Sequence, residues 1–226
     1  MTKTELLRIA KPILFTADMV RAILDDRKTV TRRVVKREKV GAVLSSDARK
    51  GNPDIPDEKF IKCLVNAPCM KGDILYVRES GIIQSMKNFD KRVKIYFPAD
   101  DSLVEFKVTP DEYERLSKFP ENKKISPYWL TKQESRIFLK VTDVRVERLQ
   151  DITIEGCEKE GCWCGNNGDI FAFMKLWDST IKKSDRDLYG WGANPWVWVI
   201  EFKRIYPDDC LEVRKGNESF RNIVNE

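Results

Sequence analysis

Hydrophobic and polar residues alternate at every second position in several short segments of the chain, a pattern typical of β-strands. The predicted strands cover residues 12–15, 29–35, 74–79, 93–97, 103–108, 136–149 and 195–202. The segment 136–149 is too long for one flat strand, so we expect a bend or bulge near Thr142 and Asp143. Segment 195–202 is apolar on nearly both faces, which predicts a strand buried on both sides.

Other segments place apolar residues at the spacing of a helix face, and polar residues mark where these helices begin and end. Thr16 caps a predicted helix that carries Met19, Val20, Ile23 and Leu24. Pro110 suits the first turn of a second helix. Thr153 caps a third helix that Gly161 ends, and Asp169 caps a fourth.

The order of these elements predicts one mainly β domain of the α+β class. We expect a small closed barrel with capping helices over residues 1–206. Weak patterning at about 36–70 and a mixed segment at 80–133 are interpreted as insertions, and 207–226 as a polar C-terminal tail.

Composition narrows the class of protein. Hydrophobic residues make up 42% of the chain and charged residues 34%, and no apolar run approaches the roughly 20 residues that span a bilayer. The first residues lack the pattern of a signal peptide, so we expect a cytoplasmic protein with reduced cysteines and no membrane partner. The chain has no histidine, which excludes Ser-His-Asp and Cys-His triads and leaves proton transfer to Lys, Glu, Asp, Cys or Tyr.

The cysteines do not form a typical metal-binding pattern. Cys157, Cys162 and Cys164 follow a Cys-x4-Cys-x-Cys spacing, whereas zinc sites usually show Cys-x2-Cys pairs and often histidine. We therefore expect no metal and no cofactor, with the cysteines acting as small buried side chains or exposed thiols. The role of six residues is left open: Cys63, Cys69, Cys157, Cys162, Cys164 and Cys210.

Positive charge is concentrated in one segment, although the net charge of the chain is only +5. Between positions 28 and 39 the chain has one acidic residue, Glu38, and six basic residues: Lys28, Arg32, Arg33, Lys36, Arg37 and Lys39. Such a bias attracts phosphate or another polyanion. The alternative is a solvated basic loop without a partner.

Lys28 and Glu160 are the candidates for proton transfer. A lysine held in a partly desolvated turn before the strand can lose its proton and act as a base toward the Thr31 hydroxyl. Glu160 ends an acidic helix, where the helix dipole raises the pKa of a carboxyl group. The alternatives are a solvated Lys28, an ordinary strand threonine and an exposed glutamate.

Strand geometry divides the residues of the predicted strand 29–35 between two faces. Period-two alternation places Thr29, Thr31 and Arg33 on one face and Arg32 on the other, so Arg33 is the better candidate for a substrate contact. Trp191 lies in a glycine-rich loop and is the candidate for an exposed ring that stacks on a base.

Four segments together resemble the ASCH domain family, whose β-barrel is related to the PUA fold of RNA-modification proteins. They contain the run Arg27-Lys28-Thr29-Val30-Thr31-Arg32-Arg33, the run Lys71-Gly72-Asp73-Ile74-Leu75-Tyr76-Val77, the long strand with its following helix, and the closing Trp198-Val199-Ile200-Glu201-Phe202. The longer pattern is similar to ASCH proteins encoded in bacterial prophages. The resemblance covers roughly residues 12–35, 71–80, 134–161 and 195–206.

The resemblance implies recognition of RNA or a modified nucleoside, and in some members hydrolysis of the amide of N4-acetylcytidine. It implies that Lys28 deprotonates Thr31 or water and that Glu160 protonates the departing amine. The chain has Asp26 where the family usually has glycine, which brings a carboxylate near Lys28. We expect nucleic-acid or substrate contacts from Arg27, Arg32, Arg33, Lys36, Arg37, Arg78 and Trp191.

Two other functions stay open. The chain is alternatively a phage accessory protein that binds another protein through residues 80–133 without catalysis, or a ribonuclease.

Overall fold

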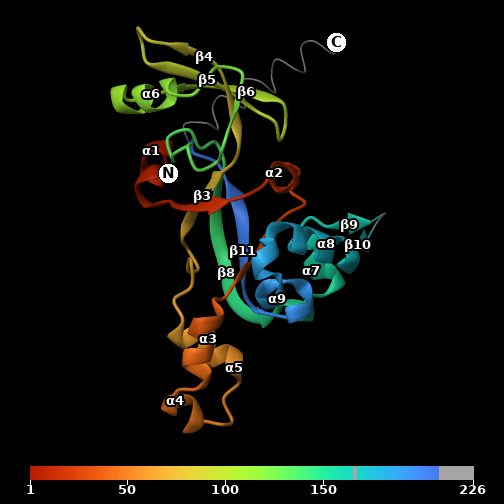
Figure 1. Cartoon of the computed structure of the whole chain (residues 1–226). Coiled ribbons are helices and arrows are strands. Elements are labelled where there is room, and N and C mark those ends of the chain that lie inside the picture. The colour runs from red at the N-terminus through yellow and green to blue at the C-terminus, as the bar shows by residue number, and fades with distance from the viewer. Residues whose placement is uncertain (165–166, 209–226) are drawn as a thin grey trace. The chain divides into compact units, whose positions relative to one another are not determined.

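The structure is a computed structural model that describes residues 1–164 and 167–208. The chain is a mixture of helices and strands of the α+β type (Figure 1). It divides into two compact units built from interleaved segments. Among the described residues the first unit contains 1–24, 73–140 and 204–208, and the second contains 25–72 and 141–203.

The first unit begins with a parallel strand pair. Strand β1 (Lys11–Leu14) pairs with β3 (Ile74–Arg78), and β3 pairs antiparallel with the first residues of β8 (Phe138–Arg148). Helices α1 (Lys3–Ile9) and α2 (Ala17–Leu24) flank β1 in the sequence. Thr16 caps α2 as expected, since its hydroxyl accepts a hydrogen bond from the Met19 backbone at 3.4 Å.

The expected insertion at 80–133 forms a sheet with its own core. Its strands follow the antiparallel order β6 (Ser102–Lys107), β5 (Arg92–Phe97), β4 (Gly81–Lys87) and β7 (Lys124–Ile125). Helix α6 (Pro110–Ser117) begins with a capping box between Thr109 and Glu112. The core packs Ile83, Val93, Ile95, Phe97 and Phe106 together.

The second unit places β2 (Val30–Val34) beside β11 (Trp196–Ile205), which neighbours β8. The β2–β11 pair is antiparallel, with Thr31 opposite Ile200 and Arg33 opposite Trp198. Its helices and remaining strands are α7 (Ile154–Lys159), β9 (Trp163–Cys164), β10 (Asn167–Gly168), α8 (Ile170–Thr180) and α9 (Arg186–Tyr189). Short 3-10 turns cover Leu149–Asp151, Lys183–Asp185 and Trp191–Ala193.

Helices also fill the expected insertion at 36–70: α3 (Arg37–Leu44), α4 (Asp47–Lys50) and α5 (Asp57–Leu64). They are drawn in orange in Figure 1, where α3 lies beside α5. These three helices were not predicted from the sequence, in which this region is weakly patterned. They bury few side chains, namely Val43, Phe60 and Ile61. Helix α3 carries little helical periodicity, whereas the apolar side of α5 was present in the sequence and was not recognised.

The closed barrel expected from the sequence is not found among the described residues. The strands outside the insertion follow the order β1-β3-β8-β11-β2, which leaves β1 and β2 as edges. The strands between 81 and 125 leave β6 and β7 as edges, so neither sheet closes into a barrel. No helix in the described part of the chain is both long and apolar enough to cross a membrane. Most of the expected C-terminal tail, from residue 209 on, lies outside the described residues.

Candidate functional site

The start of β2 and the end of α7 lie side by side in the second unit. Lys28 and Glu160 form an isolated antiparallel bridge, and the Thr29 backbone N–H donates to the Lys159 carbonyl at 2.8 Å. Helix α7 begins as expected, with the Thr153 hydroxyl accepting from the Gly156 N–H at 3.0 Å. It ends at Glu160, after which Gly161 adopts a φ of 82°.

Lys28 and Glu160 form a buried ion pair. The Lys28 Nζ lies 2.5 Å from Glu160 Oε2 and also donates to the Glu160 carbonyl at 2.9 Å. Lys28 is 2% exposed and Glu160 is 4% exposed. Both alternatives from the sequence, a solvated lysine and an exposed glutamate, are therefore wrong.

Arg32 holds the second oxygen of the same carboxylate. Its Nη1 donates to Glu160 Oε1 at 3.1 Å, and its Nη2 donates to Glu147 Oε2 at 3.4 Å. The guanidinium also lies over the Phe173 ring, with 5.7 Å to the centroid. Lys28 and Arg32 are separated by an even number of positions, which allows both to reach Glu160 from one side of the chain. Sequence reasoning favoured Arg33 and missed this role of Arg32.

Thr31 and Arg33 pair with each other on the strand, as alternation predicts. The Arg33 Nη1 donates to the Thr31 hydroxyl at 3.0 Å and to the Arg32 carbonyl at 3.1 Å. Thr31 is 1% exposed, and Arg33 is half-buried. A substrate therefore reaches the Thr31 hydroxyl only when the Arg33 guanidinium moves away.

Burial sets the electrostatics of this cluster. It lowers the pKa of Lys28 from its usual 10.5, although the Glu160 carboxylate opposes the shift, and the charge of Arg33 adds to the lowering. Burial also lowers the pKa of Arg33. A lysine with a lowered pKa that touches a carboxylate is suited to exchange a proton with it.

Asp26, at the position where the resemblance leads one to expect glycine, is exposed and has a φ of 56°. This left-handed conformation is the one that glycine adopts most readily, and Asp tolerates it. The turn before Lys28 thus has the backbone shape that a glycine would favour.

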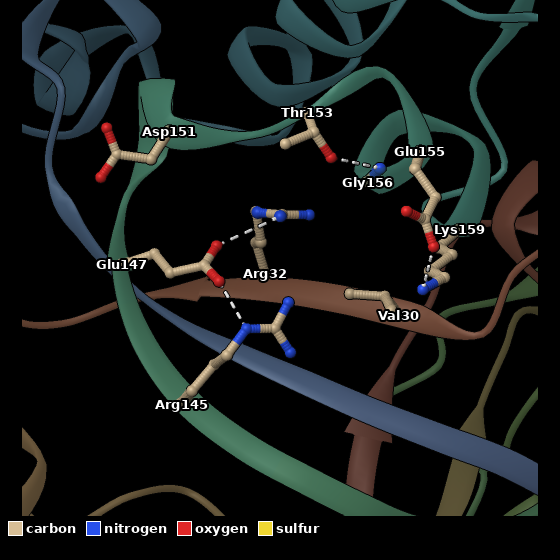
Figure 2. A pocket seen from close by; sticks show the side chains of 9 residues that line it. All are labelled: Val30, Arg32, Arg145, Glu147, Asp151, Thr153, Glu155, Gly156 and Lys159. Atoms are coloured by element: carbon tan, nitrogen blue, oxygen red, sulfur yellow. Dashed lines mark hydrogen bonds and ion pairs between the residues drawn. The ribbon is translucent and has the colours of Figure 1, made fainter.

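Arg32 also lines a pocket of about 150 Å³ (Figure 2). Its lining comes from β2, from the end of β8 with the turn that follows, and from α7: Val30, Arg32, Arg145, Glu147, Asp151, Thr153, Glu155, Gly156 and Lys159. Sequence reasoning did not single out Arg145 or Glu147. Their signal was present, because they alternate with the buried Val144 and Val146 along the long strand.

The remaining predicted binding residues are exposed or have partners of their own. Arg27 is exposed and pairs with Asp25 at 2.8 Å, and Lys36 and Arg37 are exposed at the start of α3. Arg78 belongs to the first unit, where its guanidinium donates to the Pro127 carbonyl at 3.0 Å.

Trp191 is not the freely exposed ring expected from its loop. It is half-buried and meets Phe173 edge to face, with centroids 6.1 Å apart.

Four cysteines are described as free thiols. Cys63 is exposed, whereas Cys69, Cys157 and Cys162 are buried. Burial raises the pKa of Cys157 and of Cys162 to about 11. Within residues 1–164 and 167–208 no three metal-ligating side chains gather, and the Cys164 side chain and Cys210 lie outside what the structure describes.

Comparison of the chain with protein-family models, with curated proteins and with solved structures returned no match.

Proposed function

We propose that the chain is a PUA-like ASCH domain protein that recognises RNA or a modified nucleoside and hydrolyses the amide of an N4-acylated cytidine. The observation that carries the proposal is the buried contact between the Lys28 ammonium and the Glu160 carboxylate, 2.5 Å apart and 132 positions apart in the chain. The resemblance assigns the chemistry to these two residues and Thr31.

The pKa of Lys28 supports a base role. Burial lowers it, so a neutral amine is easier to reach at this position than at an exposed lysine. Arg32 supports the same reading, because its hydrogen bond to Glu160 Oε1 orients the carboxylate while Lys28 contacts the other oxygen. Arg32 acts through Glu160 and is a positioning residue.

The proposed reaction adds water across the amide bond. The Lys28 ammonium first passes a proton to the Glu160 carboxylate. Neutral Lys28 then takes a proton from the Thr31 hydroxyl or from water, and the resulting oxygen nucleophile attacks the acyl carbon. The C–N bond then breaks, and protonated Glu160 delivers a proton to the departing N4 amine. Attack by Thr31 leaves an acyl ester that a water molecule hydrolyses, so both routes yield cytidine and a carboxylic acid.

Access to Thr31 requires a movement of Arg33. In the structure the Arg33 guanidinium donates a hydrogen bond to the Thr31 hydroxyl. We propose that the acyl carbonyl of the substrate takes over this donor, since a guanidinium N–H stabilises the negative charge that develops on that oxygen.

The proposal is tested by incubating the full chain with N4-acetylcytidine and measuring cytidine release. Thr31→Val removes the hydroxyl at nearly constant volume, and Thr31→Ser restores a hydroxyl. We expect turnover by the native chain, loss with Thr31→Val and partial recovery with Thr31→Ser, and Lys183→Gln serves as an exposed control. Absence of turnover in a folded native chain contradicts the hydrolase.

A non-catalytic RNA binder is the second candidate, and the exposed Arg27, Lys36 and Arg37 near β2 favour it. Its affinity for RNA should fall steeply with salt, because bound phosphates release counterions. Replacing Lys36 and Arg37 by Gln should reduce that slope while Thr31→Val leaves it unchanged. Tight capture of a protein with no RNA affinity would instead support the accessory role, and RNA cleavage would support a ribonuclease.

A further inference from the structure

The pocket beside Arg32 contains a buried donor without an acceptor. Arg32 lines the pocket and is 4% exposed, and its Nε has no hydrogen-bond partner although its two Nη atoms have theirs. A buried polar N–H without a partner costs free energy, so such a group calls for an explanation. Figure 2 shows the Arg32 guanidinium standing between Glu147 on β8 and the segment that carries Thr153 and Gly156.

Gly156 lies close to the Arg32 guanidinium, next to its Nη2 atom. A Cβ atom built on Gly156 would lie 3.3 Å from Arg32 Nη2, 3.0 Å from the Ile152 side chain and 3.4 Å from the Thr153 hydroxyl. The missing side chain therefore lets the α7 backbone lie close to the Nη2 atom, and any added side chain would crowd it. The Nε and Nη2 atoms of arginine form one side-on fork, the edge that binds a planar acceptor.

The Glu147 carboxylate is a hydrogen-bond acceptor next to the Arg32 guanidinium. Glu147 contacts Arg32 Nη2 at 3.4 Å through Oε2, and its Oε1 accepts from Arg145. Each carboxylate oxygen can accept more than one hydrogen bond, so Glu147 retains capacity for a further donor. A ligand that fits this edge offers a carbonyl to Arg32 and an N–H to Glu147.

Charge and size narrow the ligand further. The cations Arg32, Arg145 and Lys159 are matched by the carboxylates of Glu147, Asp151 and Glu155, so the lining does not favour an anion. Two of these carboxylates already have cationic partners, since Glu155 pairs with Lys159 at 2.6 Å and Glu147 pairs with the two arginines. A volume of about 150 Å³ matches a single six-membered ring, because a cavity of roughly that size holds benzene.

We propose that this pocket binds a small, neutral, planar amide, with the carbonyl on the Arg32 Nε edge and the amide N–H on Glu147. This binding site goes beyond the proposed hydrolysis, because Lys28, Thr31 and Glu160 are not among the residues that line the pocket. Its occupation leaves the Arg32 Nη1 bond to Glu160 in place.

Benzamide and benzoate are matched probes for the test, since they share a ring and a carbonyl and differ in the amide N–H and the charge. Binding to the full chain is measured by ligand-observed NMR at millimolar concentration, without any turnover. We expect saturable binding of benzamide and at least roughly tenfold weaker binding of benzoate. A hydrogen bond to a charged group carries about that factor or more.

Gly156→Ala is the decisive variant. Alanine favours the helix, so the protein should fold, while the added methyl group narrows the fork. We expect benzamide binding to weaken by roughly tenfold or more, whereas Lys183→Gln, at an exposed position outside the lining, leaves it unchanged. Equal binding by Gly156→Ala, tighter binding of benzoate or no benzamide binding each overturns the proposal. Because no N4-acetylcytidine is involved, this result is independent of the proposed hydrolase.

Discussion

Lys28 lies immediately before strand β2 and Glu160 caps the end of helix α7, yet the Lys28 Nζ lies 2.5 Å from Glu160 Oε2. Both side chains are nearly fully buried, and Arg32 binds the other carboxylate oxygen. Removing one partner of such a buried pair leaves an uncompensated charge, which is far costlier than losing an exposed ion pair.

We therefore predict strong coupling between Lys28→Met and Glu160→Gln. Glu160→Gln should lower the free energy of unfolding by about 3–5 kcal/mol, because it removes the carboxylate that pairs with the buried Lys28 ammonium. Lys28→Met should cost less, because Arg32 still pairs with the Glu160 carboxylate. The double variant should cost clearly less than the two singles together. Urea denaturation of the four proteins measures the coupling, and additive losses would contradict the buried pair.

The stability of the chain should depend on pH through Lys28. Its folded pKa lies below 10.5, so between the folded value and 10.5 the unfolded chain binds the proton that the folded chain has lost. The free energy of unfolding therefore rises with pH across that window, and the penalty is fully present below the folded pKa.

The measurement compares the native chain with Lys28→Met in urea titrations from neutral to alkaline pH. We expect the difference in unfolding free energy between the two proteins to shift in favour of the native chain as pH rises. If the two curves stay parallel, the pKa of Lys28 is not lowered.

Exposed and buried cysteine thiols should differ in their rates of alkylation. With a pKa of about 11, Cys157 and Cys162 hold only about one part in a thousand as thiolate at pH 8, and the thiolate is the reactive form. We expect Cys63, which is exposed, to be alkylated by iodoacetamide at least roughly a hundredfold faster. Peptide mass mapping after timed quenching measures each rate, and urea should abolish the difference.

Two glycines of the second unit should respond to alanine in opposite directions. Gly72 has a φ of 93°, where an L side chain is strained, so Gly72→Ala should cost about 1–2 kcal/mol. Gly41 lies within α3 with no atom within 4 Å of an added Cβ, so Gly41→Ala should stabilise by roughly 0.5–1 kcal/mol. Thermal denaturation of both variants, side by side, checks the pair, and a gain from Gly72→Ala would refute the assigned backbone.

Local patterns predicted much of the secondary structure. Hydroxyl and carboxylate caps at Thr16, Thr153 and Asp169 are observed, as is the end of α7 before Gly161. The alternation of β11 also holds, with Val197 to Ile200 buried on both faces. These features depend on residues within a few positions of one another, which is why periodicity and capping rules detect them.

Other elements were not predicted, because their sequences lack a clear apolar pattern. Helix α3 buries only Val43, so its polar surface resembled a solvated loop. Strand β4 begins at Gly81, where an added Cβ would lie 2.6 Å from the Ile95 side chain, so a glycine that reads as a turn in sequence serves close packing in the sheet.

The sequence by itself determined the positions of the main helix caps and the alternation of the long strands. It also placed Arg33 on the Thr31 face of β2, as the hydrogen bond between them shows. Only the tertiary structure decided that Lys28 is buried, that it meets Glu160, and that Arg32 rather than Arg33 orients that carboxylate. The reason is physical: capping and alternation are local properties of the backbone, whereas the burial of a charge depends on which distant segment supplies its counter-ion.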